Sequence, residues 1–276
     1  MATRRPSAPA AAARLHRHGR RTLRTPSRRL TRPSGSANVQ PSSTSRGPEA
    51  RYPVPVLFLG WAGAFVVANI FAAVIFGASG AASGEEPIWV IGLVALSLWV
   101  PLIMVLVTLS TRLGTGNFAR DYAVSFKPID LVGVPIGIAS QLVLVNLVYL
   151  PLREWFPGTF DVDKVEDRAR GLFDRADGAW IIVLVLVVVV GAPIVEELVY
   201  RGFIHGSLRG RFSDGVALVA AAVWFTLIHF TPVEFPGLFA FAIVLGLCFQ
   251  GTGRLGMAIA AHMAFNATGL LLVAGS

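Results

Sequence analysis

The feature that most constrains this chain is a pair of adjacent glutamates inside its most apolar segment. Residues 181–190 are ten consecutive aliphatic residues, and Glu196 and Glu197 belong to the same apolar segment, which extends over residues 179–208. Ionised side chains at membrane depth are costly, so those that persist there usually serve a function. Glu196 and Glu197 are therefore the first candidates for a functional site.

The two glutamates are expected to have different tasks. Consecutive residues of a helix point about 100° apart, so the two side chains cannot serve one face together. Glu197 and Arg201 are spaced i and i+4, which allows an ion pair that lowers the cost of burying both charges. Glu196 is then free to take a proton from water as a general base. Alternatively, the segment ends at the membrane surface, and all three charges lie in water without any chemistry.

Composition places the chain among polytopic membrane proteins. It is 54% hydrophobic and only 14% charged, whereas soluble domains carry about 25% charged residues. Residues 1–52 contain twelve arginines and one acid, Glu49, and therefore carry a net charge of +11, whereas the whole chain has +8 and the remainder thus −3. This Arg-, Ser- and Pro-rich composition is typical of disorder, so we expect a solvated cytoplasmic tail over 1–52 and a transmembrane domain over 53–276. Membrane lipid is an expected partner, and a specific nucleic acid is not.

The hydrophobic stretches predict about seven spans, and hence an all-α, polytopic transmembrane helix bundle. Gly191 and Pro193 predict a kink in the fourth span, because proline removes a helical hydrogen bond. The polar connection 153–178 allows a short interfacial helix. The expected spans are residues 54–77, 88–109, 130–152, 179–208, 214–230, 236–250 and 254–274.

The charges of the connecting loops predict the orientation. Loops on the side of the tail carry net positive charge, and those on the opposite side carry net negative charge. By the positive-inside rule, the N-terminus is expected in the cytoplasm and the C-terminus outside. His205 is expected at the surface, in the cytoplasmic turn after the fourth span.

Three further polar residues interrupt apolar helices: His229, and the i, i+4 pair of His262 and Asn266. At 1.5 Å per residue they and Glu196 lie at similar depths, roughly 12–22 Å from the cytoplasmic end. A hydrolase would use Glu196 and His229 to activate water, and His262 with Asn266 to stabilise the oxyanion. Alternatively, Glu196, His229 and His262 bind a divalent metal such as zinc, which acidifies the water. The sequence does not separate these two mechanisms.

The three motifs Glu-Glu-x-x-x-Arg, Phe-x-x-x-His and His-x-x-x-Asn follow one another in separate apolar helices within residues 180–270. In this order they resemble the CAAX protease and bacteriocin-processing enzymes, also called the CPBP or Abi intramembrane protease family. The resemblance implies an intramembrane endopeptidase, described as a metalloprotease or a glutamate endopeptidase. It implies that Glu196 and His229 activate water, that His262 and Asn266 hold the oxyanion, and that Glu197 and Arg201 are structural.

The resemblance also implies a membrane-associated or C-terminally modified peptide or protein as the substrate, and the plasma membrane of a bacterium as the expected location. The Arg-rich residues 1–52 lie outside the family pattern. Two other function classes remain open at this point. The buried Glu, His and Asn side chains would also suit a proton-coupled transporter, or a scaffold or immunity protein without catalysis.

Overall fold

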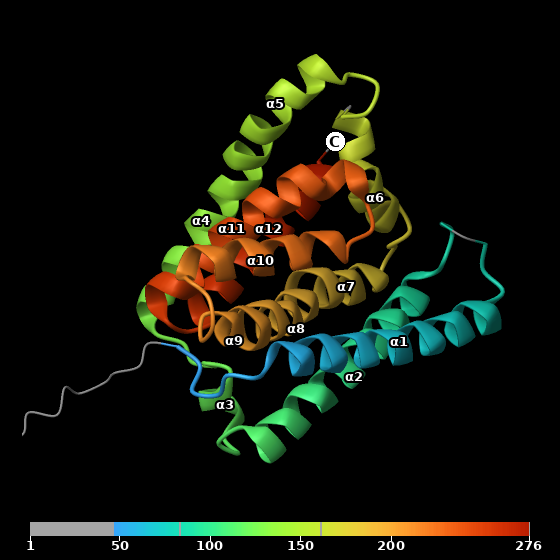
Figure 1. Cartoon of the computed structure of the whole chain (residues 1–276). Helices are drawn as coiled ribbons and strands as arrows, with labels where there is room; N and C mark the ends of the chain where they lie inside the picture. Colours follow the sequence, from blue (N-terminus) through green and yellow to red (C-terminus); the bar gives the residue numbers. More distant parts are fainter. Residues whose placement is uncertain (1–46, 83, 161, 276) are drawn as a thin grey trace, which may run out of the picture. The chain divides into compact units, whose positions relative to one another are not determined.

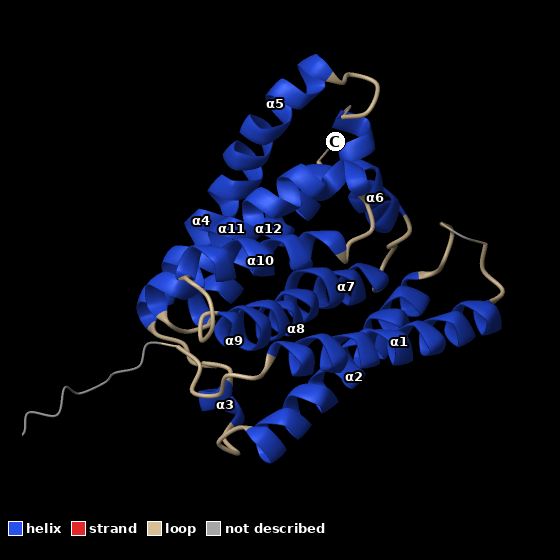
Figure 2. Cartoon of the chain, viewed as in Figure 1, coloured by secondary structure: helices blue, strands red, loops and turns tan. Residues whose placement is uncertain are grey.

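The computed structural model describes residues 47–82, 84–160 and 162–275. The chain divides into two compact units, Met1–Ser43 and Thr44–Ser276, and every described residue belongs to the second. Within the described residues all regular structure is helical (Figure 2), so the all-α prediction is confirmed. The predicted tail lies outside the described residues as far as residue 46.

Six apolar helical stretches are long enough to cross a membrane. In hydrocarbon the backbone must form its hydrogen bonds within the chain, so apolar runs of this length become helices. Large apolar side chains such as Phe58, Val74 and Met104 are exposed on them, as expected of surfaces that face lipid. The protein is therefore an integral membrane protein. The six stretches are α1 (Val54–Ser79), α2 (Ile88–Leu113), Pro128–Trp155, Trp180–Leu208, Pro232–Thr252 with α11 (Phe235–Thr252), and α12 (Gly256–Ala274).

The fifth predicted span is a shorter helix, α10 (Asp214–Leu227), of 14 residues. At 1.5 Å per residue it is about 21 Å long, less than the roughly 30 Å of a hydrocarbon core. Its start is defined by Ser213, whose hydroxyl accepts a hydrogen bond from the Val216 N–H. The prediction of about seven spans thus agrees roughly with six long stretches and one short helix.

The remaining elements are short. A helix in the polar connection was predicted, and α6 lies there. The third span is divided into several segments, one of them the π-helical η2. These elements are α3 (Phe118–Asp121), η1 (Pro128–Val132), α4 (Gly133–Ala139), η2 (Ser140–Leu144), α5 (Val145–Trp155), α6 (Val162–Asp174) and η5 (Pro232–Glu234).

Two glycines allow α4 and α12 to pack backbone to backbone. Gly133 and Gly137 are spaced i and i+4, so they lie on one face of α4. A Cβ atom at Gly133 would overlap the Met257 carbonyl oxygen, and one at Gly137 would overlap the Ala261 carbonyl oxygen. Small residues at such contacts are the usual basis of close helix packing in membranes. This contact positions α12, the helix that carries His262 and Asn266.

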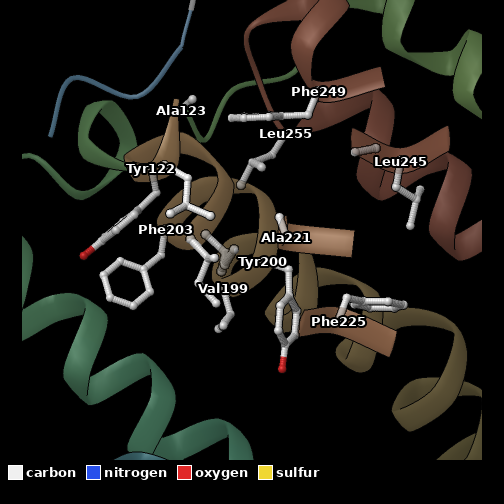
Figure 3. Packing of buried hydrophobic residues seen from close by; sticks show 14 of the residues in the cluster. Tyr122, Ala123, Val199, Tyr200, Phe203, Ala221, Phe225, Leu245, Phe249 and Leu255 are labelled. Atoms are coloured by element: carbon white, nitrogen blue, oxygen red, sulfur yellow. The ribbon is translucent and has the colours of Figure 1, made fainter. Parts of the chain in front are cut away.

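The main hydrophobic core surrounds the C-terminal part of Trp180–Leu208 (Figure 3). Tyr200 packs edge-on against Phe225 of α10, with ring centroids 5.3 Å apart. Phe203 contacts Tyr122 on another side, at 6.3 Å. Edge-to-face ring pairs add specific geometry to the burial of apolar area. The core thus fixes this segment from several directions, and α1 and α2 pack beside one another at its edge (Figure 1).

Residues 47–52, the last residues of the expected tail, pack on the helical unit. The Glu49 N–H donates to the Arg120 carbonyl at 3.0 Å, and the Tyr52 N–H donates to the Ser207 hydroxyl at 3.1 Å. Tyr52 is 1% exposed, and burial raises the pKa of its phenol. A buried aromatic ring is the physical reason that this short stretch is ordered with the helices rather than solvated.

We expect Gly137→Ala to destabilise the protein by about 1–3 kcal/mol, because the new Cβ must displace the backbone of α12. The drop in the midpoint of thermal unfolding in detergent measures this effect. Gly251→Ala is the matched control, because Gly251 is helical and nothing lies within 4 Å of its added Cβ. Equal melting of the two variants would contradict the backbone-to-backbone contact.

Candidate active site

The candidate site lies on Trp180–Leu208, the stretch that carries the labels α7, α8 and α9 in Figure 1. In it a short α-helix separates two π-helical segments. Pro193 lacks an N–H and crowds the carbonyl four residues before it. A wider turn precedes it, in which the Ala192 N–H donates to the Val187 carbonyl. The irregularity predicted at Gly191 and Pro193 thus takes the form of π-helical turns, which are frequent at functional sites. The elements are α7 (Trp180–Val185), η3 (Leu186–Gly191), α8 (Ala192–Glu197), η4 (Leu198–His205) and α9 (Gly206–Leu208).

Glu197 is buried and paired with Arg201. Arg201 Nη1 donates to Glu197 Oε1 at 2.8 Å, and the two side chains are 2% and 0% exposed. Arg201 Nη2 also donates to the Ala242 carbonyl at 3.1 Å, and its guanidinium lies 4.7 Å from the centre of the Phe225 ring. The i, i+4 pair is therefore part of a larger set of contacts that reaches α10 and α11.

His262 makes a contact that the sequence does not reveal. Its Nδ1 lies 2.8 Å from Glu197 Oε1, the same oxygen that Arg201 contacts. A carboxylate can only accept, so Nδ1 carries the proton of this hydrogen bond and the neutral ring leaves Nε2 bare. Glu197 thus holds His262 in one tautomer and one orientation, in addition to pairing with Arg201. The two residues are 65 apart in the chain, so no local spacing could have indicated the contact.

Glu196 differs from Glu197 in its surroundings. Its side chain is 25% exposed, against 0% for Glu197, and its Oε2 lies 3.8 Å from His262 Nε2. That distance is within ion-pair range but too long for a hydrogen bond. Glu196 is therefore the glutamate whose carboxylate can meet a water molecule or a substrate.

His229 follows the end of α10 and has one ring nitrogen occupied. Its Nδ1 lies 2.8 Å from the Phe225 carbonyl oxygen, and the two rings lie 4.8 Å apart between centroids. A carbonyl oxygen only accepts, so Nδ1 carries the proton and Nε2 is left as an acceptor. The residue is thus prepared to accept a proton or a hydrogen bond at Nε2.

Asn266 lies one turn beyond His262 on α12. Its Nδ2 donates to the Val188 carbonyl, in the π-helical η3, at 2.8 Å. A carboxamide nitrogen carries two hydrogens, so one N–H remains for another acceptor. The π-helical segment before Pro193 therefore also serves to orient the Asn266 amide.

One cavity of about 600 Å³ brings the four predicted catalytic side chains together: Glu196, His229, His262 and Asn266 all line it. Its walls are mostly apolar and aromatic, and they include Trp99 of α2. Trp99 approaches the catalytic stretch so closely that a Cβ at Gly191 would overlap its ring. A water molecule here would meet a carboxylate and an imidazole in surroundings of low polarity, where electrostatic interactions are strong.

A metal held by Glu196, His229 and His262 stays a prediction. Among the described residues, no three His, Cys, Asp or Glu side chains lie close enough together to hold a metal ion as they stand. His262 Nδ1 is held by Glu197 and His229 Nδ1 by a backbone carbonyl, which leaves the Nε2 atoms of both rings as acceptors. The chemistry below uses these side chains alone.

The expectation that His205 lies at the surface is wrong. Its side chain is fully buried, and its ring packs against Phe249 with centroids 5.4 Å apart. Gln250 Nε2 donates to His205 Nε2 at 3.0 Å. The end of α11 packs on His205, and residues 47–52 pack on Gly206 and Ser207 beside it, which the local sequence around His205 could not indicate.

Comparison with known proteins agrees with the motifs. Residues 178–268 match a family model described as type II CAAX prenyl endopeptidase Rce1-like. The matched segment contains Glu196, Glu197, His229, His262 and Asn266, so the predicted family resemblance is confirmed over this part of the chain. No curated protein and no solved structure matches the chain.

Replacing Arg201 should be far more damaging than replacing the partly exposed Arg209. Arg201→Leu leaves Glu197 as an uncompensated buried charge, and we expect a loss of about 3–5 kcal/mol of unfolding free energy. Arg209→Leu removes a more exposed pair with Asp214, whose side chain is 61% exposed, and should cost at most about 1 kcal/mol. Chemical unfolding in detergent measures both. Similar losses would show that Glu197 gains little from its partner.

Proposed function

Because residues 178–268 match a family model described as type II CAAX prenyl endopeptidase Rce1-like, we propose that this protein is an intramembrane endopeptidase that uses water activated by Glu196 and His229. The observation that carries the proposal is the convergence of Glu196, His229, His262 and Asn266 on one cavity. These residues come from three separate helical stretches, and a purely structural set of polar residues would have no reason to share a cavity.

The proposed first step is attack by water on the peptide carbonyl. Glu196 accepts one proton of the water, and His229 Nε2 accepts a hydrogen bond from the other, because its Nδ1 is held by the Phe225 carbonyl. The hydroxide then adds to the carbonyl carbon and gives a tetrahedral oxyanion. Glu196 is suited to the role of base because it is the partly exposed glutamate of the pair.

The oxyanion requires hydrogen-bond donors. Asn266 has one N–H left after its bond to Val188. His262 can add a donor from Nε2 only when its ring carries both protons, with the Nδ1–H still bonded to Glu197. When the intermediate collapses, the amine leaves with the proton that Glu196 took from water.

We infer that the substrate is a membrane-associated or C-terminally modified peptide or protein. The cavity lies among the membrane-crossing stretches, and the matched family is named for CAAX prenyl substrates. We also propose a bacterial plasma membrane as the location, as the family resemblance implies. The positive charge of the loops on the side of the tail supports an N-terminus in the cytoplasm, and a C-terminus outside counts the short α10 as the seventh crossing.

The decisive variant is Glu196→Gln, which keeps the shape of the side chain and removes the base. We expect cleavage to be abolished, whereas the yield in the membrane and the thermal unfolding stay unchanged. A quantitative comparison of the membrane proteome of cells that carry wild type or Glu196→Gln identifies the peptide bonds whose cleavage depends on the carboxylate.

Glu85→Gln is the matched control, since it makes the same chemical change at an exposed glutamate outside the cavity. It should cleave as wild type does. If Glu196→Gln changes the phenotype of the cell as a deletion does, and no cleavage product is lost, hydrolysis is not the function and a transport or scaffold role takes its place.

A further inference from the structure

The third membrane-crossing stretch carries a polar side chain that the proposed mechanism does not use. Gln141 lies in the π-helical segment η2, inside Pro128–Trp155, and lines the same cavity as Glu196 and His262. It precedes residues 178–268, so it is outside the segment that matches the family model. A π-helical turn inside a membrane helix often marks a functional position.

Gln141 differs from its polar neighbours because its carboxamide has no hydrogen bond within the described chain. Ser140 donates to the Ile136 carbonyl at 2.8 Å, Asn146 to the Leu142 carbonyl at 2.9 Å, and Tyr149 to the Val233 carbonyl at 2.7 Å. The other three polar side chains of this region are thus satisfied by the backbone. An unpaired amide in an apolar cavity is unfavourable, so its retention points to a ligand.

The position of Gln141 relative to the reacting groups follows from α12. A Cβ added at Gly269 would meet the Gln141 carboxamide at 3.5 Å, so the amide lies directly over that glycine. His262, Asn266 and Gly269 lie at i, i+4 and i+7, on one face of the helix. Asn266 and His262, which both contact the proposed oxyanion, lie three and seven residues before Gly269, or about 5 and 10 Å along the helix. An extended peptide advances about 3.3 Å per residue, so these distances correspond to about one to three peptide residues.

A peptide main chain is the ligand whose chemistry fits. A carboxamide both donates and accepts, and each peptide group offers one N–H and one C=O. A substrate drawn out in the membrane must have these groups satisfied, because little water is present to do so. In the proposed mechanism Glu196, His229 and His262 all act on one peptide bond. Gln141 lies further along the wall of the same cavity.

We propose that Gln141 binds the substrate main chain about one to three residues from the scissile bond, and so positions that bond against Glu196 and His229. This assignment rests on the proposed endopeptidase function and adds a positioning residue to it. The side of the scissile bond on which the contact lies is decided by the direction in which the peptide runs through the cavity.

The probe is a synthetic, internally quenched peptide that spans a cleavage site found in the Glu196-dependent comparison. With purified protein in detergent, Gln141→Leu should lower kcat/KM by about 10-fold, the effect of losing one or two hydrogen bonds. Asn146→Leu is the matched control, because it removes a carboxamide of the same stretch that bonds its own helix and does not line the cavity. It should leave kcat/KM unchanged, and both variants should unfold as wild type does.

A second series of peptides separates positioning from a merely structural role. In each peptide one backbone N–H between one and four residues from the scissile bond, on either side, is replaced by an ester oxygen. In wild type, one of these esters should lower kcat/KM about as much as Gln141→Leu does. In Gln141→Leu that ester and the parent peptide should be cleaved equally, since the partner of the missing N–H is already gone.

The two failures are distinguishable. Gln141 does not bind the main chain, although the enzyme is a peptidase, in either of two cases. In the first, Gln141→Leu cleaves the parent peptide as wild type does. In the second, every ester lowers kcat/KM by the same factor in Gln141→Leu as in wild type. If no Glu196-dependent cleavage site exists, or if Glu196→Gln cleaves the parent peptide as wild type does, the proposed function itself is wrong.

Discussion

The arrangement of the helices depends on one buried carboxylate. Glu197 is fully buried, and one of its oxygens accepts hydrogen bonds from both Arg201 and His262. An isolated charge in this interior would be strongly destabilising, so the helices must bring its partners to it. Arg201 in turn contacts the Ala242 carbonyl and the Phe225 ring. A single charge thereby links α8, η4, α10, α11 and α12, which are the elements that surround the candidate active site.

Neighbouring positions on α8 give the two glutamates opposite surroundings. A helical step of about 100° turns Glu197 into the interior and leaves Glu196 at the cavity. The buried glutamate orients His262, whereas the accessible one is left with a contact of 3.8 Å to the same imidazole. The helix geometry itself thus separates the structural task of Glu197 from the reactive task of Glu196. The flanking π-helical turns set the position of α8, and the glycines of α4 set the position of α12.

The cavity is completed by elements outside the segment that matches the family model. Trp99 of α2, Gln141 of η2 and Arg175 beyond α6 line it together with the residues of 178–268. Arg175 also donates to Glu86 Oε2 at 2.9 Å, which ties the end of α6 to the segment before α2. The groups proposed for bond cleavage therefore come from the matched segment, whereas much of the wall that a substrate would contact comes from the rest of the chain.

The sequence alone determined whatever depends on local spacing. Apolar runs specified the helices, because backbone groups in a membrane must bond within the chain, and the i, i+4 spacing specified the pair of Glu197 and Arg201. The tertiary structure decided what depends on contacts between distant residues: the bond from His262 to Glu197, the burial of His205, and the packing of residues 47–52 around Tyr52. It also showed that α10 is shorter than a full span. Such contacts arise from how helices pack, and side-chain periodicity along one helix carries no information about its neighbours.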